Sequence, residues 1–132
     1  MILRERLVTM ILPVVIAGAG SALAHHSFTM FDMTKKVTLA GTVTGFEWTN
    51  PHVYIEIDVA DETGAPKHWS VELGSPSILQ KGGWRHNTLK KGDKATLIVS
   101  PLKNGQSGGF LEQITLSDGR VLGNGPGRGP QQ

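Results

Sequence analysis

The stretch VTLAGTVTGFEW, residues 37–48, decides the fold. Its first half places apolar residues at every second position, which is the period of a β-strand. After Gly45 the apolar residues Phe46 and Trp48 fall in the opposite phase. A phase change at a glycine is what a bulge or a sharp bend produces. We therefore predict one long, bent strand that serves two parts of a small closed barrel.

Two further strands follow this stretch, at His52–Ala60 and Pro66–Gly74, each with alternating apolar and polar residues. Their apolar faces must cover the same core, and this requirement restricts how they pair. A three-residue loop at 62–64 satisfies it, with Gly64 in the left-handed conformation. The resulting register sets two pairs opposite each other: Ile57 with Trp69, and Asp58 with His68.

The second half of the chain supplies a short helix and two more strands. Ser75 and Pro76 have the residue types of a helix cap and first turn, and glycines follow at 82 and 83. Residues 94–100 and 110–116 are the fourth and fifth strands. Three strands, a helix and two strands is the connectivity of an OB-type barrel. We predict a mainly all-β, five-stranded OB-like barrel over residues 37–122, with one short helix between strands three and four.

The start of the chain predicts export. Arg4 and Arg6 precede an uncharged apolar run, which ends in small residues at Ala22 and Ala24. This pattern is typical of a secretory signal peptide, here 1–24, cleaved after Ala24. The mature protein is then periplasmic or secreted from a bacterium, without a stable membrane anchor, whereas the alternative is an uncleaved anchor. We expect an N-terminal arm over 25–36 and a disordered Gly/Pro tail over 123–132.

Charge and composition exclude two function classes. The chain has 13 Lys and Arg against 11 Asp and Glu, and its longest basic runs are the pairs 35–36 and 90–91. Such a balance gives a nucleic-acid surface no electrostatic basis. Cysteine is absent, so thiolate metal chemistry is excluded.

Six short motifs resemble those of a family of small exported bacterial proteins of unknown function. They are His-His-Ser-Phe (25–28), Phe-x-Trp-x-Asn-Pro-His (46–52), Ser-Pro (75–76), Gly-Trp (83–84), Leu-Lys-x-Gly-Asp (89–93) and Thr-Leu-x-Asp-Gly-Arg (115–120). The resemblance implies a single small β-barrel behind a signal peptide and brings no known activity. It directs attention to a set of residues near the first two motifs: His25, His26, Met30, Trp48, Asn50, Pro51 and His52.

Cleavage after Ala24 would make His25 the first residue of the mature protein. A free α-amino nitrogen and an imidazole nitrogen on one residue chelate a metal, and nitrogen donors suit Cu(II). This arrangement is analogous to the histidine brace of copper oxygenases and copper carriers. We predict copper binding through His25, with His26, His52 and Met30 as further ligands. The alternatives are a merely polar start for His25 and His26, and a His52 hydrogen-bonded to its turn.

Two other functions remain open. In the first, a metal-free binding module uses a surface of Trp48, Asn50, Tyr54 and Trp84 to bind a ligand or a periplasmic partner. Filling of the core is the alternative for the tryptophans, and Trp84 is also placed to plug one barrel end. In the second, a copper site supports a redox enzyme. We favour a binding protein over an enzyme, because no catalytic motif or substrate is specified.

Overall fold

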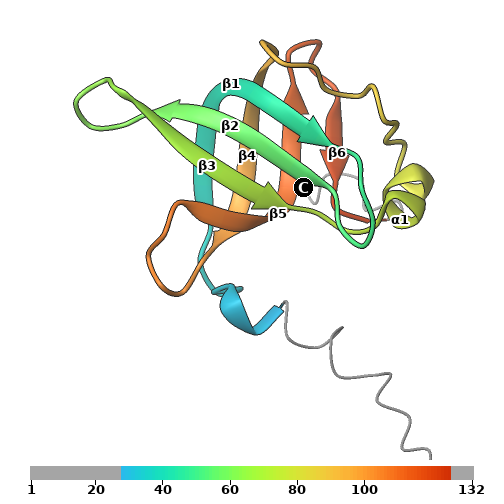
Figure 1. The fold of residues 1–132 in the computed structure, drawn as a ribbon, viewed down its shortest axis with the longest axis horizontal. Coiled ribbons are helices and arrows are strands. Elements are labelled where there is room, and N and C mark those ends of the chain that lie inside the picture. Colours follow the sequence, from blue (N-terminus) through green and yellow to red (C-terminus); the bar gives the residue numbers. More distant parts are fainter. Residues whose placement is uncertain (1–27, 126–132) are drawn as a thin grey trace, which may run out of the picture.

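The computed structural model describes residues 28–125, which form one 3₁₀ turn, six strands and one α-helix (Figure 1). The elements are η1 (Phe28–Met30), β1 (Val37–Glu47), β2 (Tyr54–Ala60), β3 (Pro66–Glu72), α1 (Pro76–Lys81), β4 (Lys94–Pro101), β5 (Gly108–Leu116) and β6 (Val121–Gly123). No helix within residues 28–125 has the length and apolar character to cross a membrane. The predicted signal peptide, His25 and His26 lie outside the described residues.

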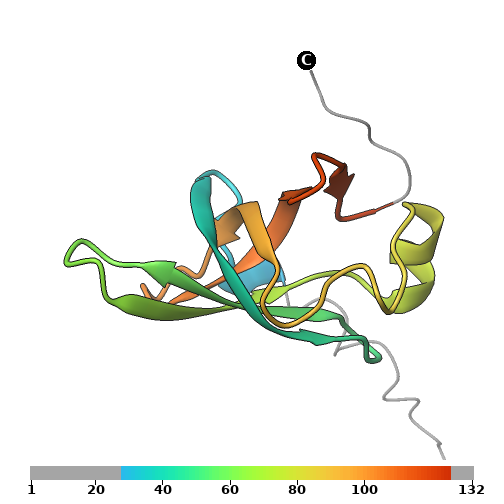
Figure 2. The same cartoon turned by 90° about the horizontal axis from the view of Figure 1, so that it is seen from above.

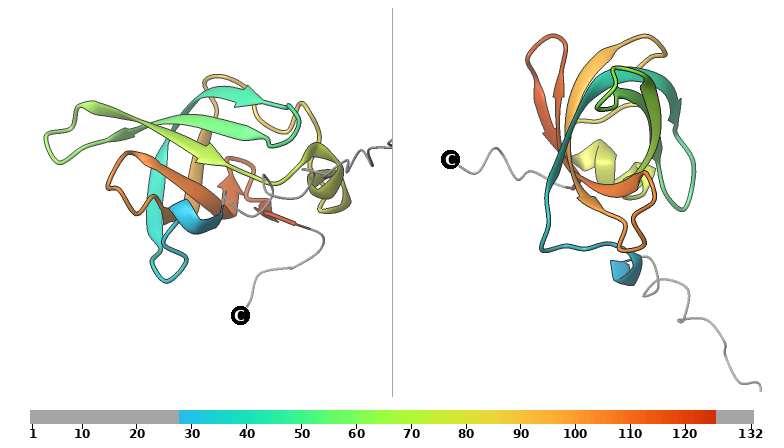
Figure 3. Two further views of the ribbon diagram at one scale, coloured as in Figure 1. Left: turned by 60° about the horizontal axis from the view of Figure 1, so that its bottom comes forward. Right: turned by 90° about the vertical axis from the view of Figure 1, so that its left-hand side faces the viewer.

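Strands β1 to β5 close into a barrel, as predicted. The sheet order is β3-β2-β1-β4-β5-β6, and a parallel pairing of β3 with β5 joins the two sides. The right-hand view of Figure 3 shows the closed barrel approximately along its axis. All other pairings are antiparallel, and the connectivity is that of an OB-type barrel. Strand β6, which was not predicted, adds to the edge of β5.

β1 is the bent strand that the phase change predicted. It pairs with β2 and with β4, and Gly41 belongs to both ladders, opposite Val59 and Ala95. A Cβ atom at Gly41 would collide with the backbone carbonyl oxygen of Asp58, so a larger residue would push the strands apart. The register shifts between Val43 and Gly45, where the bulge turns the later apolar residues inward.

The hairpin of β2 and β3 has the predicted register, with Ile57 opposite Trp69 and Asp58 opposite His68. Gly64 has φ +85°, so the left-handed position is also confirmed. The hairpin projects from the barrel at the end far from α1 (Figure 2). Before it, the turn between β1 and β2 contains a cis peptide bond at Asn50–Pro51.

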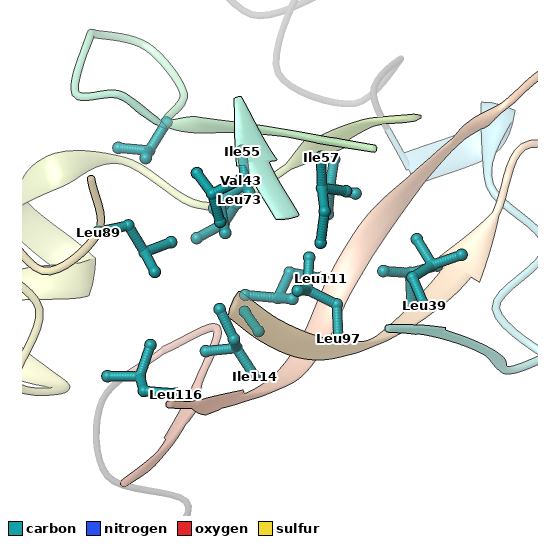
Figure 4. Close-up of a cluster of buried hydrophobic side chains, with 14 of the residues drawn as sticks. Leu39, Val43, Ile55, Ile57, Leu73, Leu89, Leu97, Leu111, Ile114 and Leu116 are labelled. Carbon is teal, nitrogen blue, oxygen red and sulfur yellow. The ribbon is translucent and has the colours of Figure 1, made fainter. Parts of the chain in front are cut away.

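Helix α1 covers one end of the barrel. The side chain of Ser75 accepts a hydrogen bond from the backbone N–H of Ile78, and Pro76 begins the helix, as predicted. The helix buries Leu79 over a core built from all five barrel strands (Figure 4). That core consists of Leu39, Val43, Val53, Ile55, Ile57, Val71, Leu73, Leu79, Trp84, Leu89, Ala95, Leu97, Val99, Leu111, Ile114 and Leu116.

The folded region continues past Leu122, where the sequence analysis ended it. Gly123 is the last residue of β6, and its carbonyl oxygen accepts a hydrogen bond from Trp84 Nε1 at 2.8 Å. The Asn124 side chain accepts from the backbone N–H of Gly74 at 2.8 Å and donates to the carbonyl oxygen of Leu111 at 2.9 Å. The folded region therefore extends to Asn124, two residues into the predicted tail, because Asn124 bonds to Gly74, which follows β3, and to Leu111 on β5.

Candidate functional site

The N-terminal arm is fixed to the outside of the barrel by aromatic contacts. The ring centroids of Phe28 and Phe31 lie 5.2 and 5.6 Å from that of Phe110 on β5. Phe31 is buried and bridges to Leu102, and the carbonyl oxygen of Met30 accepts a hydrogen bond from the backbone N–H of Lys103. η1 therefore lies beside the loop between β4 and β5 (Figures 1 and 3).

A cavity of about 350 Å³ lies between this arm and the barrel wall. The arm contributes Met30 and Phe31, and the base of the β2–β3 hairpin contributes Tyr54, Ser70 and Glu72. The β4–β5 loop and the start of β5 complete the lining with Leu102, Gln106, Ser107, Gly108 and Gly109. Three segments far apart in sequence thus surround one carboxylate.

Glu72 is the unusual residue of this cavity. Its side chain is only 10% exposed, and among residues 28–125 its polar contact is with His52 Nδ1 at 3.5 Å. That distance is longer than a good hydrogen bond. Burial raises the pKa of Glu72, while the nearby His52 acts in the opposite direction. Glu72 is thus a mostly buried carboxylate whose contact within residues 28–125 is the long one with His52.

His52 contacts Glu72 and Leu73 through the same ring nitrogen, Nδ1. Its Nδ1 lies 3.0 Å from the carbonyl oxygen of Leu73, which can only accept, so the proton is on Nδ1. The Nε2 lone pair of the neutral ring is then available. A ring N–H that donates to a backbone carbonyl is also the usual arrangement of metal-bound histidines. The ring of His52 is thus hydrogen-bonded to Leu73, after β3, and not to its own turn as the alternative predicted.

Negative charge surrounds Tyr54, which pairs with Glu72 across the hairpin and with Glu47 across β1. The pKa of the Tyr54 hydroxyl is raised, first by burial and then by the carboxylates of Glu72, Glu47 and Glu56. A site whose neighbours oppose a further negative charge favours a cation. The cavity therefore suits a metal ion or a positively charged group.

The outer half of the hairpin contrasts with this cavity because its carboxylates are paired. His68 lies 3.0 Å from Asp58 Oδ1 and 2.7 Å from Glu56 Oε2. The hydroxyl of Ser70 donates to the other oxygen of Glu56 at 2.8 Å. The predicted pair of His68 with Asp58 is confirmed, whereas the contact with Glu56 was not predicted.

Some of the predicted site residues lie at the cavity and others lie away from it. Met30 and Tyr54 line the cavity, and His52 contacts its carboxylate. Trp48 is half-buried against Phe46, with ring centroids 5.8 Å apart, and Asn50 is exposed on the turn.

Trp84 is fully buried, so its assignment to a binding surface is wrong. It fills the barrel end beneath α1, which is the plugging role that the sequence also suggested. Phe46 packs beside it, with ring centroids 6.0 Å apart. The sequence analysis missed Glu72, because alternation places it on the outer face and does not reveal that it lines a cavity together with the arm.

Residues 28–125 contain no group of three His, Asp or Glu side chains that could hold a metal ion by themselves. His52 and Glu72 are two such groups at one place. A complete metal site here would therefore need donors from elsewhere, and the arm that carries Met30 begins only three residues after His25.

A family model matches residues 13–112, described as a family of unknown function, DUF6152. The chain belongs to this family. The matched range of DUF6152 includes the positions of His25, His26, Met30, His52 and Glu72. A search of curated proteins found no match.

One solved structure is similar to this DUF6152 chain, the crystal structure of the mitochondrial single-stranded DNA binding protein Rim1 from S. cerevisiae. The two are 12% identical with a TM-score of 0.45, over 69% of this chain and 97% of that one. The OB-like architecture itself rests on the strand order and closure described above.

Proposed function

We propose that this protein is an exported periplasmic binding protein that holds copper through the α-amino and ring nitrogens of His25. His26 is a further candidate ligand. The barrel would contribute Nε2 of His52, and the arm would contribute the thioether of Met30.

The His52 ring, held through Nδ1 beside Glu72 and the cavity that Met30 lines, is the observation that supports this proposal. The Nδ1 hydrogen bond to the carbonyl oxygen of Leu73 fixes the ring so that its other nitrogen remains available. Glu72, 3.5 Å from the same ring, lines the cavity that Met30 also lines. Two of the proposed ligands are thus neighbours of one acidic cavity, beside the arm that leads back to His25.

Copper fits this donor set. An amine and imidazoles are the nitrogen ligands that Cu(II) prefers, and Cu(II) leads the divalent affinity order. A thioether is a soft ligand that suits Cu(I). Both the amine and the imidazole lose their protons to a competing metal near neutral pH.

Titration of the leader-cleaved protein with Cu(II) tests the proposal. We expect His25→Ala, or acetylation of the amine, to weaken binding at least about 100-fold, because either change removes the chelate. His52→Ala should cost about tenfold. His86→Ala is the matched control, since His86 is exposed in a loop outside the cavity lining. Micromolar or weaker affinity that none of these changes alters would rule out the copper site.

A metal-free binding module is the second candidate, supported by the open cavity at Tyr54. It predicts that Tyr54→Ala abolishes binding of an organic ligand or partner while removal of copper changes nothing. Rim1 is a single-stranded DNA binding protein, and the charge of this chain does not support such a role. The outer face of β1 to β3 presents four carboxylates, and these repel a polyanion: Glu47, Glu56, Asp58 and Glu72.

A further inference from the structure

We propose that the cavity beneath the arm is the docking site of this chain's own processed N-terminus, residues 25–27. In the metal-free protein the α-ammonium group of His25 pairs with the carboxylate of Glu72. The proposal rests on cleavage after Ala24, as the copper proposal does. It goes beyond that proposal, because the cavity would bind the N-terminus in the absence of metal.

Glu72 has the properties expected of a carboxylate that binds a cationic group. Nine-tenths of its side chain is buried, it lines the cavity, and its neighbour His52 has committed its proton to the carbonyl oxygen of Leu73. A buried carboxylate without a hydrogen bond is costly, and a cationic donor removes that cost. Ser70, which lines the same cavity, donates its hydroxyl proton to Glu56 and is therefore already engaged.

The mature N-terminus is tethered within reach. Phe28 packs on Phe110, and Phe110 is the register partner of Glu72 on the neighbouring strand. Paired strands lie about 4.8 Å apart, and partners point to the same face of the sheet. Three extended residues span about 10 Å, so residues 25–27 can bring the amine of His25 from Phe28 to the cavity.

Charge selects this occupant. Glu72 is the carboxylate in the cavity lining, and Glu47 and Glu56, which lie outside the lining, add negative charge near Tyr54. His52 lies 3.5 Å from Glu72. An α-ammonium group on a short tether has a high effective concentration at such a site. A cation free in solution lacks this advantage.

NMR of the leader-cleaved, metal-free protein tests the docking directly. We expect nuclear Overhauser contacts from His25 to the ring of Tyr54 and the methyl group of Met30, with ordered backbone at 25–27. Glu72→Gln should reduce the docked population at least about tenfold, the weight of one charge-assisted hydrogen bond. Acetylation of the His25 amine in the wild-type barrel should do the same, and the two changes together should cost no more than one.

Glu47→Gln is the matched control, because Glu47 neighbours Tyr54 and is exposed on β1, outside the cavity lining. It should leave the contacts of His25 in place. The proposal is overturned if residues 25–27 show random-coil dynamics in the wild-type protein, or if acetylation leaves the contacts unchanged. Copper titration of the same samples separates the two proposals. Tight copper binding through His25 without docking would support the copper site and contradict the docking proposal. Docking without copper affinity would support the docking proposal and contradict the copper site.

Discussion

Within residues 28–125, buried polar groups are hydrogen-bonded at the α1 end of the barrel but not in the barrel wall beneath the arm, which is the side of the cavity that carries Glu72. At the α1 end Trp84 is fully buried, yet its indole N–H reaches the carbonyl oxygen of Gly123, and the amide of Asn124 makes two hydrogen bonds. At the wall, Glu72 is nearly as deeply buried and has only the long contact with His52. A buried polar group is ordinarily paired, so the hydrogen bonds of the first region stabilise the fold, whereas Glu72 is the group on which the proposed docking depends.

Loss of Trp84 should have the largest effect on stability. Trp84→Ala removes a fully buried indole and leaves a cavity, so we expect the free energy of unfolding to fall by about 3–5 kcal/mol. Denaturant unfolding measures this loss. Trp48→Ala is the control, because Trp48 is half-buried on the same cluster and should cost less than half as much. Equal losses would contradict the assignment of Trp84 as the seal of this end.

Asn124 should contribute less than Trp84 but more than a surface residue. Asn124→Ala removes the hydrogen-bond partner of the backbone N–H of half-buried Gly74 and of the carbonyl oxygen of fully buried Leu111. We expect a loss of about 2 kcal/mol in the free energy of unfolding. Asn87→Ala, on an exposed loop, should change it by less than about 0.5 kcal/mol. If Asn124→Ala matched Asn87→Ala, residue 124 would not belong to the folded domain.

The sequence predicts the barrel and its α1 cap far better than it predicts the cavity that carries Glu72. The strand order, the bend at Gly45, the hairpin register and the cap at Ser75 all follow from local patterns of period, glycine position and capping residues. Glu72 could not be recognised in this way. The cavity that it lines is completed by Met30 and Phe31 of the arm and by the β4–β5 loop, and no periodicity encodes this meeting of distant segments.

Strand β6 and Asn124 were missed for a related reason. The segment from Val121 onward is short and rich in glycine, and such composition is typical of a disordered tail. The hydrogen bonds that hold it are made to Gly74, Trp84 and Leu111, which are distant in sequence. The segment is therefore ordered by contacts with distant residues and not by its own composition.

The two carboxylates Glu72 and Glu56 should respond to the same substitution with opposite signs. In protein that begins at Phe28 with an acetylated amine, Glu72→Gln should raise the free energy of unfolding by about 1 kcal/mol, since it removes a mostly buried charge that has only the long contact with His52. Glu56→Gln should lower it by about 1 kcal/mol, because Glu56 accepts bonds from Ser70 and His68. Denaturant unfolding measures both changes. A loss of stability in both variants would mean that Glu72 is as well paired as Glu56.

The smallest effect should come from His68 and should depend on pH. Hydrogen bonding to Asp58 is the largest cause that raises the pKa of His68, and Glu56 adds to it. A histidine whose pKa is higher in the folded state stabilises fully below its unfolded value of about 6.5, and this contribution disappears as pH rises through the folded value. The side chain is 56% exposed, so solvent keeps the effect below about 1 kcal/mol.

The difference in unfolding free energy between wild type and His68→Gln should therefore be larger at about pH 5.5 than at about pH 8.5. His86→Gln is the control, because His86 is exposed in its loop and should give the same difference at both values. A gap that widened toward high pH would mean that neutral His68 is the stabilising form. The paired carboxylates would then no longer explain why the outer hairpin differs from the wall that carries Glu72.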